Sequence, residues 1–200
     1  MNDMQKIHNE LNHIITTIQP EERFILAIDG LSRAGKTTLV TQLSRLLQKE
    51  EIGFQVFHID DHIVDRNKRY GTGFEEWYEY YQLQWDVGWL KSEFFNQLKS
   101  APELTLPFYN TDTHSQVFRS VALPESGLIL VEGIFLQRTE WRGMFDKVIF
   151  LDCPREKRFD RETEETKQNI IKFENRYWKA EEYYVKTINP AGKADLVVGT

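Results

Sequence analysis

Hydrophobic residues are arranged along this chain in two recurring patterns. Short, continuous apolar runs predict strands that are buried on both faces, as in parallel sheets. Apolar residues spaced three and four positions apart predict helices that pack on such a sheet. The continuous runs lie at residues 24–28, 54–59, 128–131, 148–151 and 196–198.

A helical pattern joins the first two runs. Its apolar residues are Leu39, Val40, Leu43, Leu46 and Leu47. Gly53 follows them as a helix stop, just before the second run. Because a helix between two strands makes a βαβ unit, we predict a parallel central sheet.

A second helical pattern precedes the first run. Ile7, Leu11, Ile14, Ile15 and Ile18 repeat at helical intervals and stop before Pro20. We therefore predict an amphipathic helix at residues 4–18, within an N-terminal segment 1–20 that packs on the domain. The same helix could equally form a dimer contact, which leaves a homo-oligomer open.

The segment between residues 60 and 100 is predicted to be a loop followed by helices. Residues 62–73 are rich in charge and glycine with little apolar periodicity, which indicates a loop over the substrate. Residues 74–81 are aromatic and acidic, and their aromatic side chains form either a core stripe, the commoner case, or the wall of a pocket. A helix is predicted at 87–98, with Asp86 placed to cap it.

Two further regions stand apart from the sheet pattern. Strand-like runs at 104–109 and 117–123 flank polar residues 110–115, which predicts a hairpin over about 103–123 that projects from the main sheet. Residues 155–186 are charged and helical in pattern, and we expect about 153–176 to form a lid.

Composition narrows the class of protein. Two hundred residues fit one domain, 1–200, and the single Cys153 excludes an internal disulfide. No signal-like segment and no membrane-length apolar run is present, so we expect a cytoplasmic protein without a membrane partner. A formal net charge of −6 argues against nucleic-acid binding, because duplex affinity depends mainly on Lys and Arg. The expected partner is a small molecule.

A phosphate-binding motif follows the first apolar run directly. Residues 30–37 match GxxxxGK[ST], between a predicted strand and a predicted helix, which is the setting that a P-loop requires. Its glycines allow a nest of backbone N–H donors, Lys36 supplies a cation for the terminal phosphates and Thr37 offers a hydroxyl to Mg²⁺. The expected ATP- or GTP-binding residues are Gly30, Leu31, Ser32, Arg33, Ala34, Gly35, Lys36, Thr37 and Thr38.

Acidic residues follow three of the apolar runs. Asp60 with Asp61, Glu132 and Asp152 each come just after a predicted strand. Ligands of open α/β sheets bind at the carboxyl ends of the strands, so Asp60 and Glu132 are expected near the P-loop. There they would hold Mg²⁺ with Thr37, or orient a nucleophile. Either could instead be an ordinary solvated residue at a strand end.

Arginines recur every three residues at the start of the predicted lid. On a helix, Arg155, Arg158 and Arg161 would lie along one side, where they could reach charge that develops on a phosphoryl group in transfer. In the competing interpretation, Arg158 with Glu162 or Arg161 with Glu165 forms an exposed ion pair of small energetic value.

Taken in order, these motifs resemble the uridine kinase and phosphoribulokinase group of P-loop kinases, uridine kinases above all. The resemblance rests on the P-loop, Asp60-Asp61, residues 131–133, the arginine-spaced lid, the hairpin segment 107–114 and the closing segment 194–198. It implies a P-loop NTPase-type three-layer α/β fold with a mostly parallel central sheet, a small substrate-binding β-hairpin and a helical lid.

The same resemblance implies roles for individual residues. Asp60 would be the catalytic carboxylate beside the acceptor hydroxyl, with Asp61 next to it on the substrate side, and Asp86 would contact the ribose. Tyr109 and His114 would clamp the base, and Arg158 and Arg161 would act from the lid. The chain departs from the family at Asn110, where an acidic residue is usual, and in an acidic lid with Glu162, Glu164 and Glu165.

The predicted function is Mg²⁺-dependent transfer of the γ-phosphoryl of ATP or GTP to the 5′-hydroxyl of a pyrimidine nucleoside. Alternatives are phosphorylation of another small alcohol, such as nicotinamide riboside or pantothenate, and a non-catalytic nucleotide-binding regulator. A GTPase switch is disfavoured because the chain has no Asn-Lys-x-Asp motif.

Overall fold

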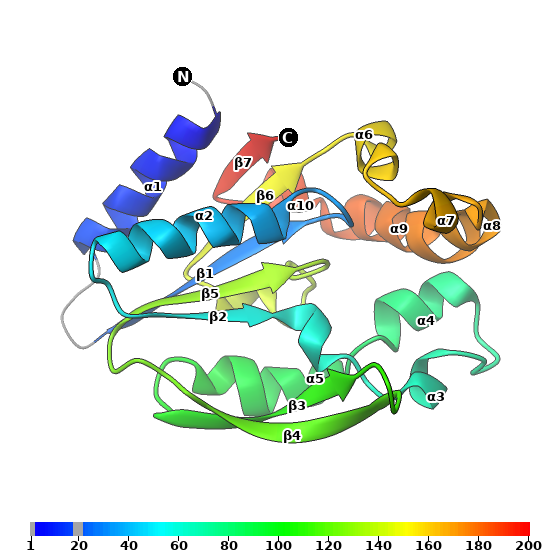
Figure 1. Ribbon diagram of the computed structural model, residues 1–200, viewed down its shortest axis with the longest axis horizontal. Coiled ribbons are helices and arrows are strands. Elements are labelled where there is room, and N and C mark those ends of the chain that lie inside the picture. Colours follow the sequence, from blue (N-terminus) through cyan, green and yellow to red (C-terminus); the bar gives the residue numbers. More distant parts are fainter. Residues whose placement is uncertain (1–2, 18–21) are drawn as a thin grey trace.

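A five-stranded parallel sheet forms the centre of the molecule in a computed structural model that describes residues 3–17 and 22–200 (Figure 1). Its strand order is β2-β5-β1-β6-β7. The strands are β1 (Arg23–Gly30), β2 (Phe54–His58), β5 (Gly127–Gly133), β6 (Lys147–Asp152) and β7 (Leu196–Gly199). The predicted mostly parallel central sheet is thus confirmed, and each strand corresponds to one of the continuous apolar runs.

Helices cover both faces of this sheet, because side chains alternate between the faces along each strand. Leu26 and Ile28 of β1 pack with helices α1 (Asp3–Thr17) and α2 (Lys36–Lys49) in one hydrophobic cluster. Ile25 and Ala27 pack on the other side, in a cluster that includes the aromatic residues of the segment 80–95. The result is the three-layer arrangement that the sequence predicted. Residues 18–20 of the predicted N-terminal segment lie outside the described residues.

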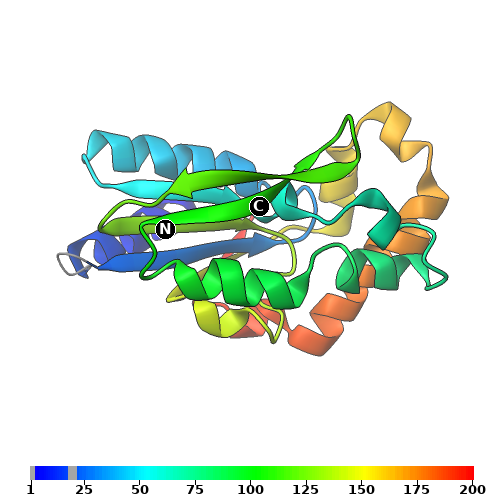
Figure 2. The same ribbon diagram turned by 90° about the horizontal axis from the view of Figure 1, so that it is seen from below.

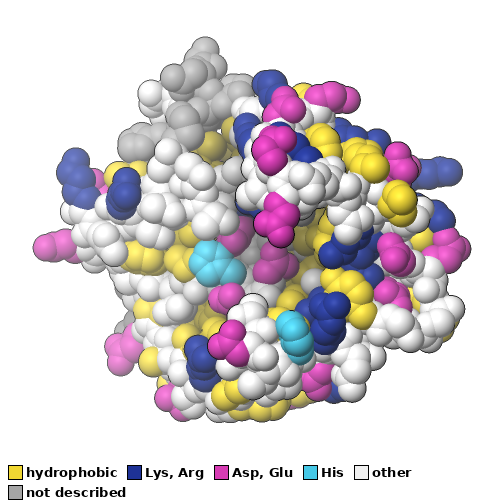
Figure 3. All heavy atoms as spheres, turned by 45° about the vertical axis from the view of Figure 1, so that its right-hand side comes forward, with side chains coloured by type: hydrophobic (Ala, Val, Ile, Leu, Met, Phe, Trp, Pro, Cys, Tyr) yellow, Lys and Arg dark blue, Asp and Glu magenta, His cyan; other side chains and the backbone are white. Residues whose placement is uncertain are grey.

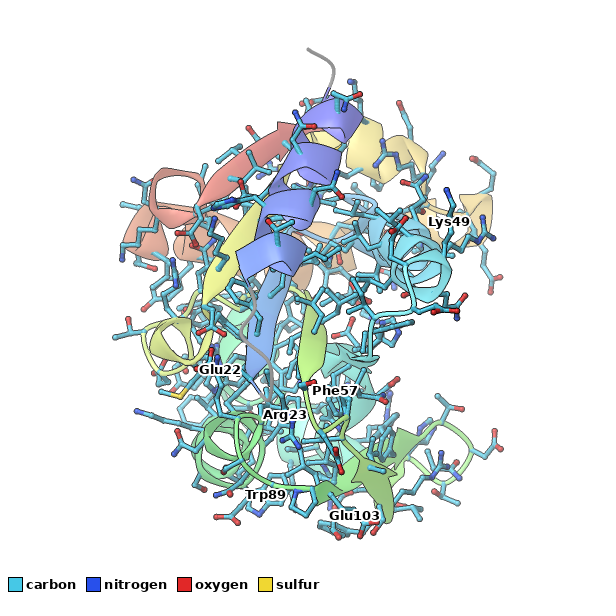
Figure 4. The ribbon with its side chains drawn as sticks, turned by 90° about the vertical axis from the view of Figure 1, so that its left-hand side faces the viewer. Glu22, Arg23, Lys49, Phe57, Trp89 and Glu103 are labelled. Carbon is cyan, nitrogen blue, oxygen red and sulfur yellow. The ribbon has the colours of Figure 1, made fainter. Side chains whose placement is uncertain are left out.

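Strands β3 (Glu103–Asn110) and β4 (Ser115–Ala122) pair as an antiparallel hairpin outside the main sheet. Seen from below, the hairpin lies in front of the main sheet (Figure 2). Arg23 at the start of β1, labelled in Figure 4, ties the two together. Its guanidinium is buried and donates to the carbonyls of Leu98, Ala101 and Pro124. The base of the hairpin is therefore held at the amino-terminal end of β1, which is the end opposite the P-loop.

The segment between β2 and β3 is more helical than the sequence indicated. It contains η1 (Ile59–His62), α3 (Arg66–Arg69), α4 (Glu76–Gln82), α5 (Val87–Trp89), η2 (Leu90–Phe94) and η3 (Phe95–Gln97). The predicted loop 62–73 is thus interrupted by a turn of helix. The predicted helix 87–98 continues through a π-helical and then a 3₁₀ turn. Asp86 caps its start, as predicted, by accepting a bond from the Trp89 amide.

The C-terminal third is a series of short helices around the carboxyl ends of the strands. After η4 (Arg142–Met144) and β6 come α6 (Arg155–Asp160), α7 (Glu164–Lys167), α8 (Ile170–Lys172), the π-helical η5 (Phe173–Trp178), α9 (Lys179–Ile188) and α10 (Pro190–Lys193). In Figure 1 they lie at the end of the sheet where α2 begins. None of the helices in residues 3–17 and 22–200 is long and apolar enough to cross a membrane.

Candidate active site

The P-loop joins the C-terminal end of β1 to the start of α2. Gly35 begins α2 in the left-handed region, with φ of 98°, a conformation that is costly for residues with a Cβ. Lys36 Nζ donates to the Leu31 carbonyl at 3.1 Å, so the ammonium group folds back over its own loop. Among residues 3–17 and 22–200 no carboxylate is its hydrogen-bond partner, so this cation is available to an anion.

A second glycine explains how the acidic residues reach the P-loop. A Cβ on Gly133, at the end of β5, would lie 2.0 Å from Ile59 Cγ2. Only glycine at this position allows η1, the turn after β2, to pass so close to the end of β5. This close approach brings Asp60 of η1 and Glu132 of β5 to the carboxyl ends of the strands, where the P-loop also lies.

A cavity of about 680 Å³ opens at this edge, and Figure 3 shows it as a hollow with acidic side chains at its centre. The volume is in the range of small-molecule sites. Ten of the residues predicted for the site line this cavity: Ser32, Arg33, Gly35, Lys36, Thr37, Thr38, Asp60, Glu132, Arg158 and Arg161. Phosphate-binding and acidic residues from distant parts of the chain therefore share one space.

Glu132 is the centre of the polar contacts at the bottom of the cavity. Its Oε1 accepts a bond from the Thr37 hydroxyl at 3.2 Å and lies 2.6 Å from His58 Nδ1, while its buried Oε2 has no hydrogen-bond partner among the described residues. The hydrogen bond to Glu132 raises the pKa of His58. A hydroxyl beside a carboxylate with a free oxygen suits Mg²⁺, a hard cation that prefers oxygen ligands.

Asp60 lies beside this group, where it lines the cavity and is exposed to it. Desolvation by the surrounding protein raises the pKa of its carboxyl, and the nearby Lys36 ammonium partly opposes this effect. In the described residues no cluster of three or more His, Cys, Asp or Glu side chains is arranged as a metal site. Thr37, Glu132 and Asp60 offer a hydroxyl and two carboxylates, a small set of oxygen ligands of the kind that Mg²⁺ takes from a protein while it keeps several waters.

The lid arginines have partners that the sequence did not reveal. Arg158 is buried and forms a two-pronged ion pair with Glu181 of α9, at 2.9 and 3.0 Å, and it also donates to the carbonyls of Cys153 and Ser32. Arg161 donates to the Arg33 carbonyl. The proposed exposed pair of Arg158 with Glu162 is wrong, because Glu162 pairs with Arg33 instead.

Glu181 therefore links the lid to the P-loop. Besides binding Arg158, its Oε1 accepts a bond from the Ser32 amide at 3.1 Å. Burial raises the pKa of Glu181, while the guanidinium of Arg158 favours its charged form. The sequence analysis missed this residue because its partners lie 23 and 149 positions away.

Four predicted substrate residues do not line this cavity: Asp61, Asp86, Tyr109 and His114. The side chain of Asp86 is engaged as the helix cap described above. Tyr109 and His114 contact each other, with the tyrosine oxygen 3.1 Å from His114 Nδ1, and His114 lines a second, separate cavity. The turn α3 lies beside them, and its Arg69 guanidinium covers the Tyr109 ring.

Tyr80 of the aromatic segment 74–81 and the nearby Gln84 also line the main cavity. Tyr80 also packs edge-on against Phe135 and Tyr177, so it belongs to both the core and the pocket. Gln84 is buried and its side-chain oxygen has no partner. The sequence posed core and pocket as alternatives for this segment, whereas Tyr80 serves both.

Asp29 is a further residue that the sequence analysis passed over. It is fully buried one position before the P-loop, and its carboxylate accepts bonds from the Gly30 amide, Gln137 Nε2 and Tyr184 Oη. Burial raises the pKa of Asp29. An acidic residue between the first apolar run and the P-loop was a signal in the sequence, and in the structure its hydrogen bonds hold the end of β1.

Comparison with known proteins places this site in a family. Residues 25–199 match the model of the "Phosphoribulokinase / Uridine kinase family". The chain belongs to this family. The resemblance inferred from the motifs is thus confirmed, and membership supports a kinase.

Relatives within the family include two bacterial uridine kinases. That of Borrelia duttonii (strain Ly) is 25% identical over 188 residues, covering 87% of this chain and 85% of the relative. That of Staphylococcus haemolyticus (strain JCSC1435) is 23% identical over 184 residues, covering 87% and 86%. Both alignments thus span most of each protein.

Solved structures agree with this placement. A protein of Bacillus stearothermophilus, described as a possible uridine kinase, is 50% identical, with a TM-score of 0.84 and coverage of 98% of this chain and 99% of that one. Phosphoribulokinase from Rhodobacter spheroides shares the fold, with a TM-score of 0.63 at 15% identity and coverage of 90% and 71%.

Proposed function

We propose that this protein transfers the γ-phosphoryl group of ATP or GTP to the 5′-hydroxyl of a pyrimidine nucleoside. The observation that carries the proposal is that one cavity is lined by both the P-loop and the Asp60 carboxylate. Phosphoryl transfer depends mainly on positioning and on stabilising charge, and this arrangement can supply both. The bacterial relatives named uridine kinase support the nucleoside as acceptor.

In this proposal the P-loop amides and Lys36 hold the phosphates, and Asp60 orients the acceptor hydroxyl. A carboxyl group, even one whose pKa burial has raised, is much too weak a base to deprotonate a free alcohol. Asp60 therefore aligns the hydroxyl and takes its proton late in the transfer. Arg161, held at the P-loop by the Arg33 carbonyl, lies where it can meet the transferring group.

Thr37 and Glu132, with Asp60, would hold Mg²⁺ beside the phosphates. The bound ion would offset the negative charge of the phosphate oxygens. Arg158 has a different role from Arg161 in this proposal, because its donors are already used by Glu181 and two carbonyls. We assign it the task of holding the lid to the P-loop.

In this proposal the acceptor is recognised on the side of the cavity that carries Asp60. Tyr80 and Gln84 line the cavity with Asp60 and are placed to contact the acceptor. Base contacts from Tyr109 and His114, and further contacts from Asp61 and Asp86, would require the hairpin and its neighbours to close toward Asp60. Another small alcohol, such as nicotinamide riboside or pantothenate, is the alternative acceptor.

An acceptor panel with an Asp60 variant tests the proposal. ADP or GDP release should depend on a nucleoside, and Asp60→Asn should lower kcat by about 10²- to 10⁴-fold with nearly unchanged ATP affinity. Asp152→Asn is the matched control, because Asp152 is an exposed aspartate at the carboxyl end of the same sheet, like Asp60, but lies outside the cavity.

Two results would contradict the proposal in different ways. Unchanged turnover in Asp60→Asn would remove Asp60 from the mechanism. Nucleotide binding with no acceptor-dependent turnover for any alcohol tested would favour the non-catalytic regulator.

A further inference from the structure

The proposed transfer assigns no role to His58, although this residue touches the carboxylate at the bottom of the main cavity. His58 ends β2, which is an edge strand of the sheet, and its side chain is 38% exposed. β2 runs parallel to β5, and the register of the two strands pairs His58 with Glu132. Because register partners carry their side chains on the same face, the sheet itself brings the imidazole to the Glu132 carboxylate.

The contact between these two side chains is short and directed. His58 Nδ1 lies 2.6 Å from Glu132 Oε1, whereas the Thr37 hydroxyl lies 3.2 Å from the same oxygen. A carboxylate only accepts hydrogen bonds, so Nδ1 is the donor whether or not Nε2 also carries a proton. The Thr37 bond is longer than the usual range of about 2.5 to 3.0 Å for hydroxyl donors. His58 is therefore the stronger of the two partners.

Glu132 requires such a partner if one of its oxygens is to be kept for a cation. The terminal torsion of a glutamate is broad and roughly two-fold, so the carboxylate turns easily unless hydrogen bonds hold it. His58 and Thr37 both bind Oε1, and the buried Oε2 is left without a hydrogen-bond partner in the part of the chain that the structure describes. Thr37 is itself expected to bind the ion, which leaves His58 as the residue that fixes the carboxylate.

The charges around His58 also permit a different role. Besides the bond to Glu132, the charges of Asp61 and Asp60 raise the pKa of His58. A charged imidazole that served only to offset these carboxylates would compete with a cation for Glu132. An imidazole that orients Glu132 would instead strengthen cation binding. The short contact to Oε1 and the unpartnered Oε2 favour the second role, and the two roles predict opposite effects on ion binding.

We propose that His58 is a positioning residue, which holds Oε1 of Glu132 and so leaves Oε2 for the Mg²⁺ that accompanies the phosphates. The inference rests on the proposed function for the presence of this ion, but it concerns binding of the ion rather than the transfer step. Hydrogen-bond partners of metal-ligating side chains typically contribute about 10- to 100-fold to metal affinity.

Three substitutions at position 58 test this role. His58→Asn retains a donor, because Asn Nδ2 and His Nδ1 are both two bonds from Cβ. His58→Gln moves the donor one carbon farther, and His58→Leu removes it. The measurement is the dissociation constant of Mn²⁺, from electron paramagnetic resonance of the free ion, for protein saturated with whichever of AMP-PNP and GMP-PNP it binds.

We expect His58→Leu to raise the Mn²⁺ dissociation constant about tenfold or more, His58→Asn to stay close to the parent protein and His58→Gln to lie between them. Affinity for the nucleotide analogue in EDTA should be the same in all of them, because no phosphate contact is lost. A general disturbance of the site would lower this affinity as well.

Two further variants separate a local effect from an effect on β2 as a whole. Gln55→Leu is the matched control, because it removes another partly exposed polar side chain from β2, one that bonds to a carbonyl of its own strand. It should leave the Mn²⁺ affinity unchanged. In a Glu132→Gln background His58→Leu should have no additional effect, since His58 acts through Glu132.

Several results would overturn the inference. Tighter Mn²⁺ binding in His58→Leu would show that the imidazole competes with the ion, and equal losses in His58→Asn and His58→Leu would show that the hydrogen bond is not what matters. If the Mn²⁺ results are as expected but no alcohol supports turnover, the proposed function fails and this inference stands. If turnover depends on a nucleoside but all variants at position 58 bind Mn²⁺ alike, the reverse holds. Binding of neither analogue would contradict both.

Discussion

The phosphate side and the lid side of the main cavity use their cations in opposite ways. On the phosphate side, Lys36 donates a hydrogen bond to a carbonyl of its own loop and lies near Asp60, but it forms no ion pair with any described residue, so its ammonium group can bind a ligand. On the lid side, Arg158 and Arg176 are buried in ion pairs with Glu181 and Glu79. The first region is arranged for binding and the second for holding its own segments together.

This difference indicates which property, stability or ligand affinity, a mutation in each region will change. A buried ion pair that loses one partner leaves an uncompensated charge, which is costly to the fold. A cation without a carboxylate partner costs the fold little when it is removed, but its ligand loses a contact. We therefore expect lid variants to be defective mainly in stability and P-loop variants mainly in affinity.

The largest effect is expected for Arg158→Met, which leaves Glu181 buried without its partner. The free energy of unfolding, measured by urea denaturation, should fall by about 3 to 5 kcal/mol. The double variant Arg158→Met/Glu181→Gln should recover part of this loss, because no buried charge remains. A loss within 1 kcal/mol of zero would show that the lid does not depend on this pair, and the contrast between the two regions would disappear.

A smaller effect, on ATP affinity rather than on stability, is expected for Lys36→Ala. Loss of a charged contact to phosphate should weaken ATP binding by about 1.5 to 3 kcal/mol, or roughly 10- to 150-fold, in calorimetric titrations. Unfolding should be changed by no more than about 1.5 kcal/mol, since only one hydrogen bond is lost. Equal ATP affinity in the variant and the parent protein would rule out the P-loop as the phosphate site.

The two regions also differ in how far they could be predicted from sequence. The P-loop is a contiguous run, so the spacing of Gly30, Gly35, Lys36 and Thr37 was enough to predict it, and the apolar runs were enough to predict the sheet. Asp60 and Glu132 followed from the rule that parallel strands end at one edge. The partners of Arg158 could not be predicted in this way, because no local pattern connects it with Glu181 across the helices between them.

The sequence pattern also gave an incomplete prediction for the segment beside the hairpin. The family resemblance gave Tyr109 and His114 the role of clamping the base, which stays a prediction; the structure shows the helical turn α3 beside them and His114 at a separate cavity. The charged residues and two glycines of the segment 62–73 indicated only a loop. The turn forms because its amides and side chains find partners on the hairpin, which is a tertiary effect that local spacing does not encode.

Acid should weaken the lid region through Glu79. Burial pushes the pKa of Glu79 upward, but hydrogen bonds from Thr72 and Arg176 outweigh it, so the pKa is lowered from 4.5. The stability from this carboxylate is then fully present above pH 4.5 and is lost as the pH falls through the lowered pKa. Chemical denaturation at several pH values should show a shallower acid decline in Glu79→Gln. An unchanged slope would mean that Glu79 is not the titrating group.

The smallest effect is expected one helical turn from Arg158, at an exposed pair between the same two helices. Arg155 of α6 binds Glu182 of α9 at 2.7 Å, with side chains 39% and 62% exposed, against 6% and 2% for Arg158 and Glu181. Because water screens the exposed charges, Arg155→Met should change the free energy of unfolding by only about 0 to 1 kcal/mol. The two substitutions are chemically identical and affect the same two helices; besides burial, the sites differ in that Arg158 also donates to two carbonyls and Arg155 lies over the Trp178 ring. Similar losses in both variants would show that the α6–α9 contact as a whole, rather than the enclosed charge of Glu181, sets the stability of the lid.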